Sequence, residues 1–255
     1  MTLPPVLISL GAFGASEVRR HGQCGFARLA AEAGADGVEV RAELLTDPAR
    51  ELPALAALAD AAGLARVHSS PDGLWNAEGA LDESALERAL EQARLLGAPR
   101  LKISIGGYVS GGRGLERLAR RLSGTPVQLL IENDQTEAAG TLPALRRFFA
   151  DARAAGLLLP LTFDMGNWHW LGEDPLQAAQ ALAPEVGYVH CKGVQRRPDR
   201  WVAVPLRESA APWRAVLRAL PAGVPRAIEY PLQGDDLAAV TRAEIALLRR
   251  VETDR

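Results

Sequence analysis

Short hydrophobic segments alternate with longer amphipathic segments along the whole chain. The short segments are rich in β-branched and aliphatic residues, and Gly, Pro, Asn or Asp borders each of them, which is typical of buried strands. The pattern predicts eight strands, at residues 6–13, 37–44, 65–70, 100–107, 127–134, 159–167, 186–193 and 225–231.

The amphipathic segments predict helices, because their apolar residues recur at helical spacing and their ends carry helix signals. Segment 82–97 begins at a capping Asp82 and ends on Gly97, and segment 141–156 begins at Thr141 and ends on Gly156. The remaining helices are predicted at 26–34, 51–63, 115–124, 175–185, 212–223 and from residue 235 onward.

Eight strand–helix units predict an α/β protein that folds as a single (β/α)8 TIM barrel over residues 1–255. The alternative is an open doubly wound sheet. The sequence GAFGAS near the start lacks the last glycine of a dinucleotide-binding G-x-G-x-x-G motif, and no linker or change in composition divides the chain. One barrel domain is therefore the better interpretation.

Composition narrows the classes of partner. With 29 basic and 31 acidic residues the net charge is -2, which gives no general attraction to nucleic acid or to an anionic membrane surface. No segment is long and apolar enough for a membrane span, and the N-terminal segment does not resemble a signal peptide. Two cysteines do not suggest a disulfide framework. We expect a cytoplasmic protein, for which a homodimer is a possible assembly.

Alternation along the predicted strands places many charged and polar side chains inside the barrel. The inward set includes Glu39, Arg41, Arg66, His68, Lys102, Ser104, Gln128, Glu132, Thr162, Asp164, His190, Lys192 and Glu229. Unpaired buried charge is costly, so such groups must pair with one another or bind something.

Four of these residues stand at the carboxyl ends of the last four strands, where the active sites of such barrels lie. Glu132, Asp164, His190 and Glu229 supply oxygen and nitrogen ligands suited to one divalent metal ion: Mn²⁺, Mg²⁺, Co²⁺ or Zn²⁺. The alternative is a buried ion-pair network in which Arg41, Arg66 and Lys102 hold the carboxylates.

Both lysines of this arginine-rich chain, Lys102 and Lys192, fall on inward positions. A lysine there can orient a substrate hydroxyl or carboxylate or take part in acid–base chemistry, and it can also be a structural partner of a buried glutamate. Trp168 follows the sixth strand and is a candidate for stacking on a sugar face.

At these residues the sequence resembles the xylose isomerase-like TIM barrels, a superfamily of sugar isomerases and epimerases that also contains endonuclease IV. The motifs that carry the resemblance are GADGVEVR, LLIEND, FDMGNWH, YVHCKG and AIEYP. The segment VAVPLRES after the seventh strand departs from the glycine-rich segment that is frequent in the family. In FDMGNWH, the motif leaves open whether Asn167 or His169 reaches the substrate.

The resemblance implies a metal-dependent isomerase or epimerase of a small sugar or hydroxy-ketone, which transfers a proton through a metal-stabilised enediolate. It implies Glu132 and Glu229 as the catalytic pair. We expect Lys102, His68, Asn167, His169, Lys192 and Trp168 to bind a sugar or keto-polyol substrate.

Three other functions are alternatives to this one. A related keto-polyol dehydratase or lyase would use the same groups. An endonuclease IV-like nuclease would need more metal ligands than the four histidines of this chain provide. A barrel without activity is disfavoured by the intact set of four ligands.

Overall fold

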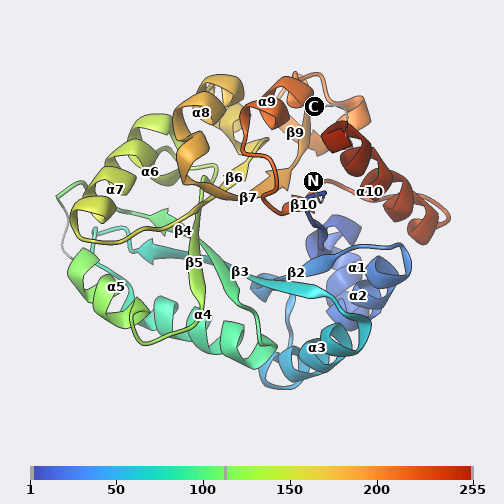
Figure 1. Cartoon of the computed structure of the whole chain (residues 1–255), viewed down its shortest axis with the longest axis horizontal. Coiled ribbons are helices and arrows are strands. Elements are labelled where there is room, and N and C mark those ends of the chain that lie inside the picture. Colours follow the sequence, from blue (N-terminus) through green and yellow to red (C-terminus); the bar gives the residue numbers. More distant parts are fainter. Residues whose placement is uncertain (1–2, 112–113, 254–255) are drawn as a thin grey trace.

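The computed structural model describes residues 3–111 and 114–253. Eight parallel strands close into a barrel, and helices surround it (Figure 1). The strands follow one another around the barrel in the order β1-β10-β7-β6-β5-β4-β3-β2, which confirms the predicted single (β/α)8 TIM barrel. Their bounds are β1 (Val6–Ser9), β2 (Gly37–Arg41), β3 (Ala65–Trp75), β4 (Arg100–Gly106), β5 (Gln128–Glu132), β6 (Leu161–Asp164), β7 (Val186–Cys191) and β10 (Arg226–Ile228).

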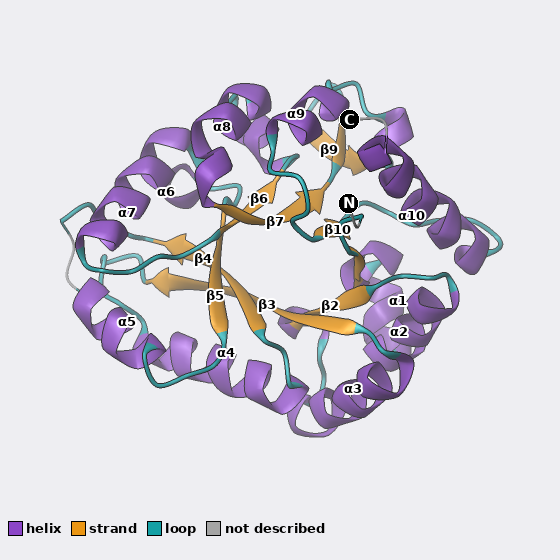
Figure 2. Ribbon diagram, in the orientation of Figure 1, coloured by secondary structure: helices purple, strands orange, loops and turns teal. Residues whose placement is uncertain are grey.

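Helices form the outer ring of the molecule (Figure 2). They are α1 (Ala15–His21), α2 (Gln23–Glu32), α3 (Pro48–Ala62), α4 (Glu83–Leu96), α5 (Leu115–Leu122), α6 (Glu137–Gly140), α7 (Leu142–Ala154), α8 (Pro175–Leu182), α9 (Trp213–Ala219) and α10 (Leu237–Thr253). Short 3-10 helices are η1 (Leu10–Phe13), η2 (Ala42–Leu44), η3 (Asn167–Leu171), η4 (Ala183–Glu185) and η5 (Leu206–Glu208). Within the described residues, no helix has the length and apolar character needed to cross a membrane.

The predicted helix signals act largely as expected. The Asp82 side chain accepts a hydrogen bond from the Ala85 backbone N–H at 2.9 Å, which satisfies a free N–H group at the start of α4. Gly97 ends this helix in the left-handed conformation, with φ of 63°, which glycine adopts without steric cost. Thr141 precedes α7 as predicted, but its side chain makes no capping hydrogen bond there.

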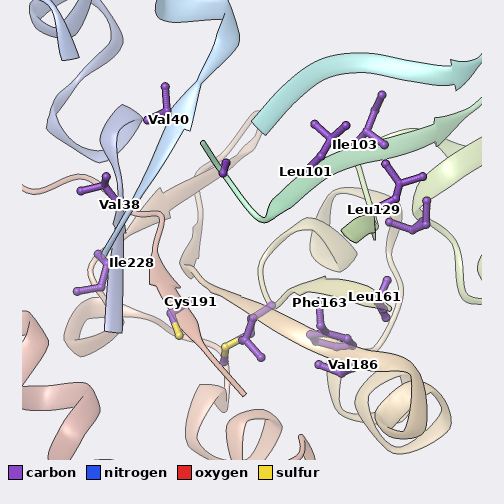
Figure 3. Close-up of a cluster of buried hydrophobic side chains, with 14 of the residues drawn as sticks. Val38, Val40, Leu101, Ile103, Leu129, Leu161, Phe163, Val186, Cys191 and Ile228 are labelled. Atoms are coloured by element: carbon purple, nitrogen blue, oxygen red, sulfur yellow. The ribbon is translucent and has the colours of Figure 1, made fainter. Parts of the chain in front are cut away.

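Two hydrophobic layers stabilise the barrel. The interior holds a small cluster of Leu7, Val67, Leu130, Tyr188 and Ala227. A much larger cluster fills the space between the strands and the outer helices. Figure 3 shows part of it, with apolar side chains from β2, β4, β5, β6, β7 and β10. The outer faces of the strands therefore supply most of the apolar packing, and the interior is left for polar groups.

The inward orientation predicted for Arg66 and His68 is wrong. The register pairs Glu39 with Val67 and Ser69 with Lys102, so Val67 and Ser69 are the inward residues of β3. Arg66 instead pairs with Asp60 at 2.8 Å, and the His68 ring hydrogen-bonds Gln92 at 3.1 Å, both toward the outer helices. Polar residues occupy both faces of this strand, so polarity alone could not reveal which face is internal.

The segment after the seventh strand also differs from the prediction. β7 ends at Cys191, and β8 (Gly193–Arg196) and β9 (Trp201–Val204) form an antiparallel hairpin that was not predicted. A Cβ atom at Gly193 would lie 2.5 Å from the Val204 carbonyl oxygen. Glycine is therefore required where the hairpin closes on the barrel.

Candidate metal centre

The four predicted ligands converge at one end of the barrel. Glu132 and Asp164 end β5 and β6, His190 lies near the end of β7, and Glu229 directly follows β10. The register aligns Asp164 with His190, and the Glu229 backbone N–H continues the ladder by donating to the Cys191 carbonyl at 3.0 Å. One ligand atom from each of the four residues lies within 4.8 Å of the others, which confirms their predicted convergence.

His190 stands at the centre of the cluster. Its Nδ1 atom lies 2.9 Å from Glu132 Oε1, 3.0 Å from Glu229 Oε2 and 3.8 Å from Asp164 Oδ2. The opposite ring atom, Nε2, lies 2.7 Å from Glu39 Oε2. A metal ion on Nδ1 requires the ring proton on Nε2, and Glu39 is placed to accept it, as carboxylates behind metal-bound histidines commonly do.

Asp164 is held by backbone groups that leave one oxygen free. Its Oδ1 atom accepts hydrogen bonds from the N–H groups of Gly166 at 2.7 Å and Asn167 at 2.9 Å. The Asn133 side chain donates to the Asp164 carbonyl at 3.0 Å and accepts from its N–H at 2.8 Å. These contacts fix the residue from both sides, so Oδ2 is directed at the cluster.

Three cations neutralise part of the charge. Lys102 donates to Glu132 Oε2, Lys192 lies 2.7 Å from Asp164 Oδ2 and 2.9 Å from Glu229 Oε2, and Arg41 pairs with Glu229 Oε1. The five carboxylates in this assembly are Glu39, Glu43, Glu132, Asp164 and Glu229. With His190 neutral, two negative charges remain, which is the charge that one divalent cation compensates.

Ionisation inside the cluster reflects this excess of carboxylates. Burial alone would lower the pKa of His190, but Glu229 and Glu39 outweigh it and raise that pKa well above its usual value. Burial and the nearby Glu229 raise the pKa of Asp164 to about 6, although Lys192 opposes them. Burial would also raise the pKa of Glu132, but Lys102 and His190 lower it to about 2. The excess of carboxylates therefore favours the binding of a proton or a cation at the cluster.

The residues fit a metal ion by an independent criterion. Asp164 Oδ2, His190 Nδ1 and Glu229 Oε2 are buried, and none of them makes a hydrogen bond of good geometry within the described residues. Lys192 lies close to the two oxygens but is not aligned with them as a donor. Buried polar atoms without partners are rare and point to a ligand, and a set of three carboxylates and one imidazole suits a divalent cation.

The other predicted site residues divide into three groups. Lys102 and Lys192 contact the cluster directly, and Asn167 accepts a hydrogen bond from Lys192 at 3.2 Å. His169 is half-buried, and its ring lies 4.9 Å from that of Trp201 in the hairpin, at one side of the barrel mouth.

Trp168 and His68 lie away from the cluster. Trp168 is 0% exposed and packs against Phe163, in the hydrophobic layer between strands and helices. His68 faces Gln92 on α4. The expected contacts of these two side chains with substrate have no support in this geometry.

Two residues at the site, Gln23 and Glu43, were not identified from the sequence as site residues. The buried Gln23 side chain donates to the Arg41 carbonyl and accepts from its N–H, both at 2.9 Å. Glu43 then lies 2.8 Å from Arg41, which points the guanidinium at Glu229. Gln23 lies at the start of α2 and is buried. Its burial is what distinguishes it from other glutamines, and burial cannot be read from the sequence.

A cavity of about 400 Å³ opens beside the cluster. Its charged lining consists of Arg19, Arg41, Glu43, Lys192 and Glu229, and Ser9 and Tyr230 are the lining residues that carry hydroxyl groups. Much of the remaining wall is glycine and alanine, from the segment after β1 and from Ala203 of the hairpin. Small side chains keep this space open, so a small polar molecule can reach Glu229 and Lys192.

Comparison with known proteins agrees with this geometry. Residues 27–251 match the family description "xylose isomerase-like TIM barrel". A search of curated proteins finds no match.

Among solved structures, a probable 3-DHS dehydratase of petrobactin synthesis from Bacillus anthracis superposes with a TM-score of 0.70 at 16% identity, over 96% of this chain and 98% of that one. An L-ribulose 3-epimerase gives 0.67 at 19% identity, with coverage of 99% and 96%. A D-allulose 3-epimerase from Methylomonas sp. gives 0.69 at 15%, with coverage of 98% of each chain. At these identities the likeness shows a shared fold.

Proposed function

Because this chain belongs to the xylose isomerase-like TIM barrel family, we propose that it is a metal-dependent isomerase or epimerase of a small sugar or hydroxy-ketone. The observation that carries the proposal is the convergence of Glu132, Asp164, His190 and Glu229 within 4.8 Å beside an open cavity. The sugar epimerases among the structural neighbours support the same class of reaction.

The proposed cofactor is one divalent ion held by Glu132, Asp164, His190 and Glu229. A bound divalent cation would supply a Lewis acid that stabilises negative charge on the substrate oxygens when the neighbouring proton leaves. Asp164 and His190 would hold the ion, because their remaining polar atoms are already bonded to backbone N–H groups and to Glu39.

Glu132 and Glu229 are the proposed proton-transfer pair. They come from β5 and from the end of β10, and β6 and β7 lie between these strands in the barrel wall. The two carboxylates can therefore approach a substrate from different sides. Glu229 lines the cavity, and Arg41 holds the carboxylate oxygen that faces away from His190.

Lys192 is the proposed substrate-orienting cation. Its ammonium group lies between Asp164 and Glu229 and also lines the cavity. It can donate to a substrate hydroxyl or carbonyl from that position. Asn167 fixes the lysine from behind at 3.2 Å, and His169 and Trp201 of the mouth are candidates for the outer contacts.

A dehydratase or lyase that acts on a keto-polyol is the second candidate, because a structural neighbour of similar TM-score is a probable dehydratase. Both reactions begin with removal of a proton beside a carbonyl, and they diverge when a hydroxyl group leaves. Product analysis by NMR therefore distinguishes them.

The test of the proposal is exchange of substrate hydrogen with deuterated water. Metal-loaded protein should incorporate deuterium beside the carbonyl of a ketose substrate. Glu132→Gln and Glu229→Gln should each slow this exchange by orders of magnitude while metal binding persists in part. Exchange that continues undiminished in both variants would refute the assignment of the two glutamates.

A further inference from the structure

The cavity beside the metal cluster contains one cation with no anionic partner. Arg19 lies on α1 and lines this cavity together with Glu229 and Lys192. Its acidic neighbour on the same helix, Glu17, instead lies 3.5 Å from His21. Within residues 3–111 and 114–253, Arg19 forms no ion pair.

The other cations of the site are already engaged. Arg41 contacts Glu229, Glu43 and Glu39, Lys102 contacts Glu132, and Lys192 lies between Asp164 and Glu229. These partners hold the cations at the metal cluster, so they are not free to bind a distant charge of the substrate. Arg19 stands outside this network and faces the same open space.

The charge balance points to the kind of ligand that Arg19 would bind. The five carboxylates, Arg41, Lys102, Lys192 and one divalent ion sum to zero when His190 is neutral. Arg19 adds one positive charge to the cavity wall. The Arg19 side chain is exposed and has no anionic partner among the described residues. A neutral sugar would form no ion pair with it, whereas a ligand with a single negative charge would.

Resting on the function proposed above, we propose that the substrate is a hydroxy-ketone that carries a carboxylate and that Arg19 binds this group. A guanidinium offers two parallel N–H donors that match the two oxygens of a carboxylate. A phosphate group carries close to two charges at neutral pH, and the cavity wall offers Arg19 as its single unpaired cation among the described residues. Carboxylate is therefore the better match in charge.

The experiment uses three ligands that differ in one group: D-fructose, its C6-oxidised form D-fructuronate, and D-fructose 6-phosphate. Calorimetry on the metal-loaded protein gives the affinity of each. We expect D-fructuronate to bind about tenfold more tightly than D-fructose, as one charge-assisted contact would give, and more tightly than the phosphate.

Variants of α1 identify the residue that is responsible. Arg19→Gln should abolish the preference for D-fructuronate, and Arg19→Lys should keep part of it. Arg20→Gln is the matched control, because Arg20 is the adjacent exposed arginine on the same helix and is not among the cavity-lining residues. It should bind all three ligands as the wild type does.

Equal affinity for the three ligands, a preference for the phosphate, no binding of any of them, or a preference that survives in Arg19→Gln would each overturn the proposal. The metal titration is measured separately on the same samples. Failure to bind a divalent ion would count against the proposed function, whereas normal metal binding without a carboxylate preference would count against the role of Arg19 alone.

Discussion

The carboxylate behind His190 provides the sharpest mutational test of the metal centre. Glu39 and His190 are both 0% exposed, and 2.7 Å separates Glu39 Oε2 from His190 Nε2. In Glu39→Gln the ring loses the negative charge that fixes its proton on Nε2 and directs Nδ1 at the cluster. Water cannot replace that carboxylate at a fully buried position, so the imidazole becomes a poorer and less oriented ligand.

The expected loss follows from what carboxylates of this kind contribute elsewhere. Removing one typically costs about 10–100-fold in metal affinity, which corresponds to about 1.4–2.7 kcal/mol. Because both partners are buried, we expect the larger half of that range. Isothermal titration of Mn²⁺ or Zn²⁺ into metal-free protein measures the effect, and circular dichroism before each titration confirms that the variant is folded.

Glu43→Gln is the matched control for the loss of one negative charge. Glu43 lies 2.8 Å from Arg41, it is not among the carboxylates that pair with His190 in the described part of the chain, and its side chain is 29% exposed. Metal affinity should therefore fall far less in this variant. If Glu39→Gln and Glu43→Gln weaken metal binding equally, the effect is one of net charge, and the role assigned to Glu39 in orienting His190 is wrong.

Two further predictions concern groups on either side of the barrel wall. Burial lowers the pKa of His68 to about 4, whereas in the unfolded chain this pKa is about 6.5. Between these two values only the unfolded chain binds the proton, so the contribution of His68 to stability is lost as the pH falls from about 6.5 to about 4. The loss is about 1.4 kcal/mol per pH unit. Denaturant unfolding at pH 7 and pH 5 should show a smaller loss of stability on acidification in His68→Gln than in the wild type, and identical losses would contradict the assignment. Lys102→Met removes the ammonium group that pairs with Oε2 of buried Glu132, so turnover should fall by about tenfold or more and the metal-free protein should lose about 3–5 kcal/mol of stability. Arg117→Met, at an exposed pair with Glu83, should change stability by less than about 1 kcal/mol, and an equal effect of the two substitutions would show that Lys102 has no special role.

The sequence predicted the barrel and the convergence of the four candidate ligands because two strong signals agreed. Residues typical of the ends of strands and helices recur in eight successive units. The polar residues Glu132, Asp164, His190 and Glu229 stand at equivalent places on four strands. Apolar residues such as Leu129, Phe163 and Ile228 on the opposite faces fixed the orientation of those strands. Wherever one face was clearly apolar, alternation gave the correct result.

The predictions failed where a strand had no clear difference between an apolar and a polar face, or where no sequence signal marked an element. On β3 both faces are buried and both carry polar groups, so Arg66 and His68 were assigned to the interior although the register places Val67 there. The hairpin of β8 and β9 depends on pairing between Gly193 and Val204, and no strong turn signal marks it in the sequence. Arg19 could not be identified as a candidate ligand-binding residue from the sequence either. Its role depends on its place in the cavity wall and on the pairing of Glu17 with His21, and only the structure shows these.

The proposed function requires that Glu132, Asp164, His190 and Glu229 form one divalent-metal site. The most direct measurement is anomalous diffraction from crystals of the Mn²⁺-loaded protein, together with the metal content of the same preparation. We expect about one ion per chain and a single strong peak about 2.0–2.3 Å from one oxygen of each carboxylate and from His190 Nδ1. We also expect the peak to be lost in His190→Ala. A peak elsewhere, or no peak at millimolar Mn²⁺ with the four side chains still in contact with Lys102, Lys192 and Arg41, would contradict this expectation and would show that the cluster is a buried ion-pair network.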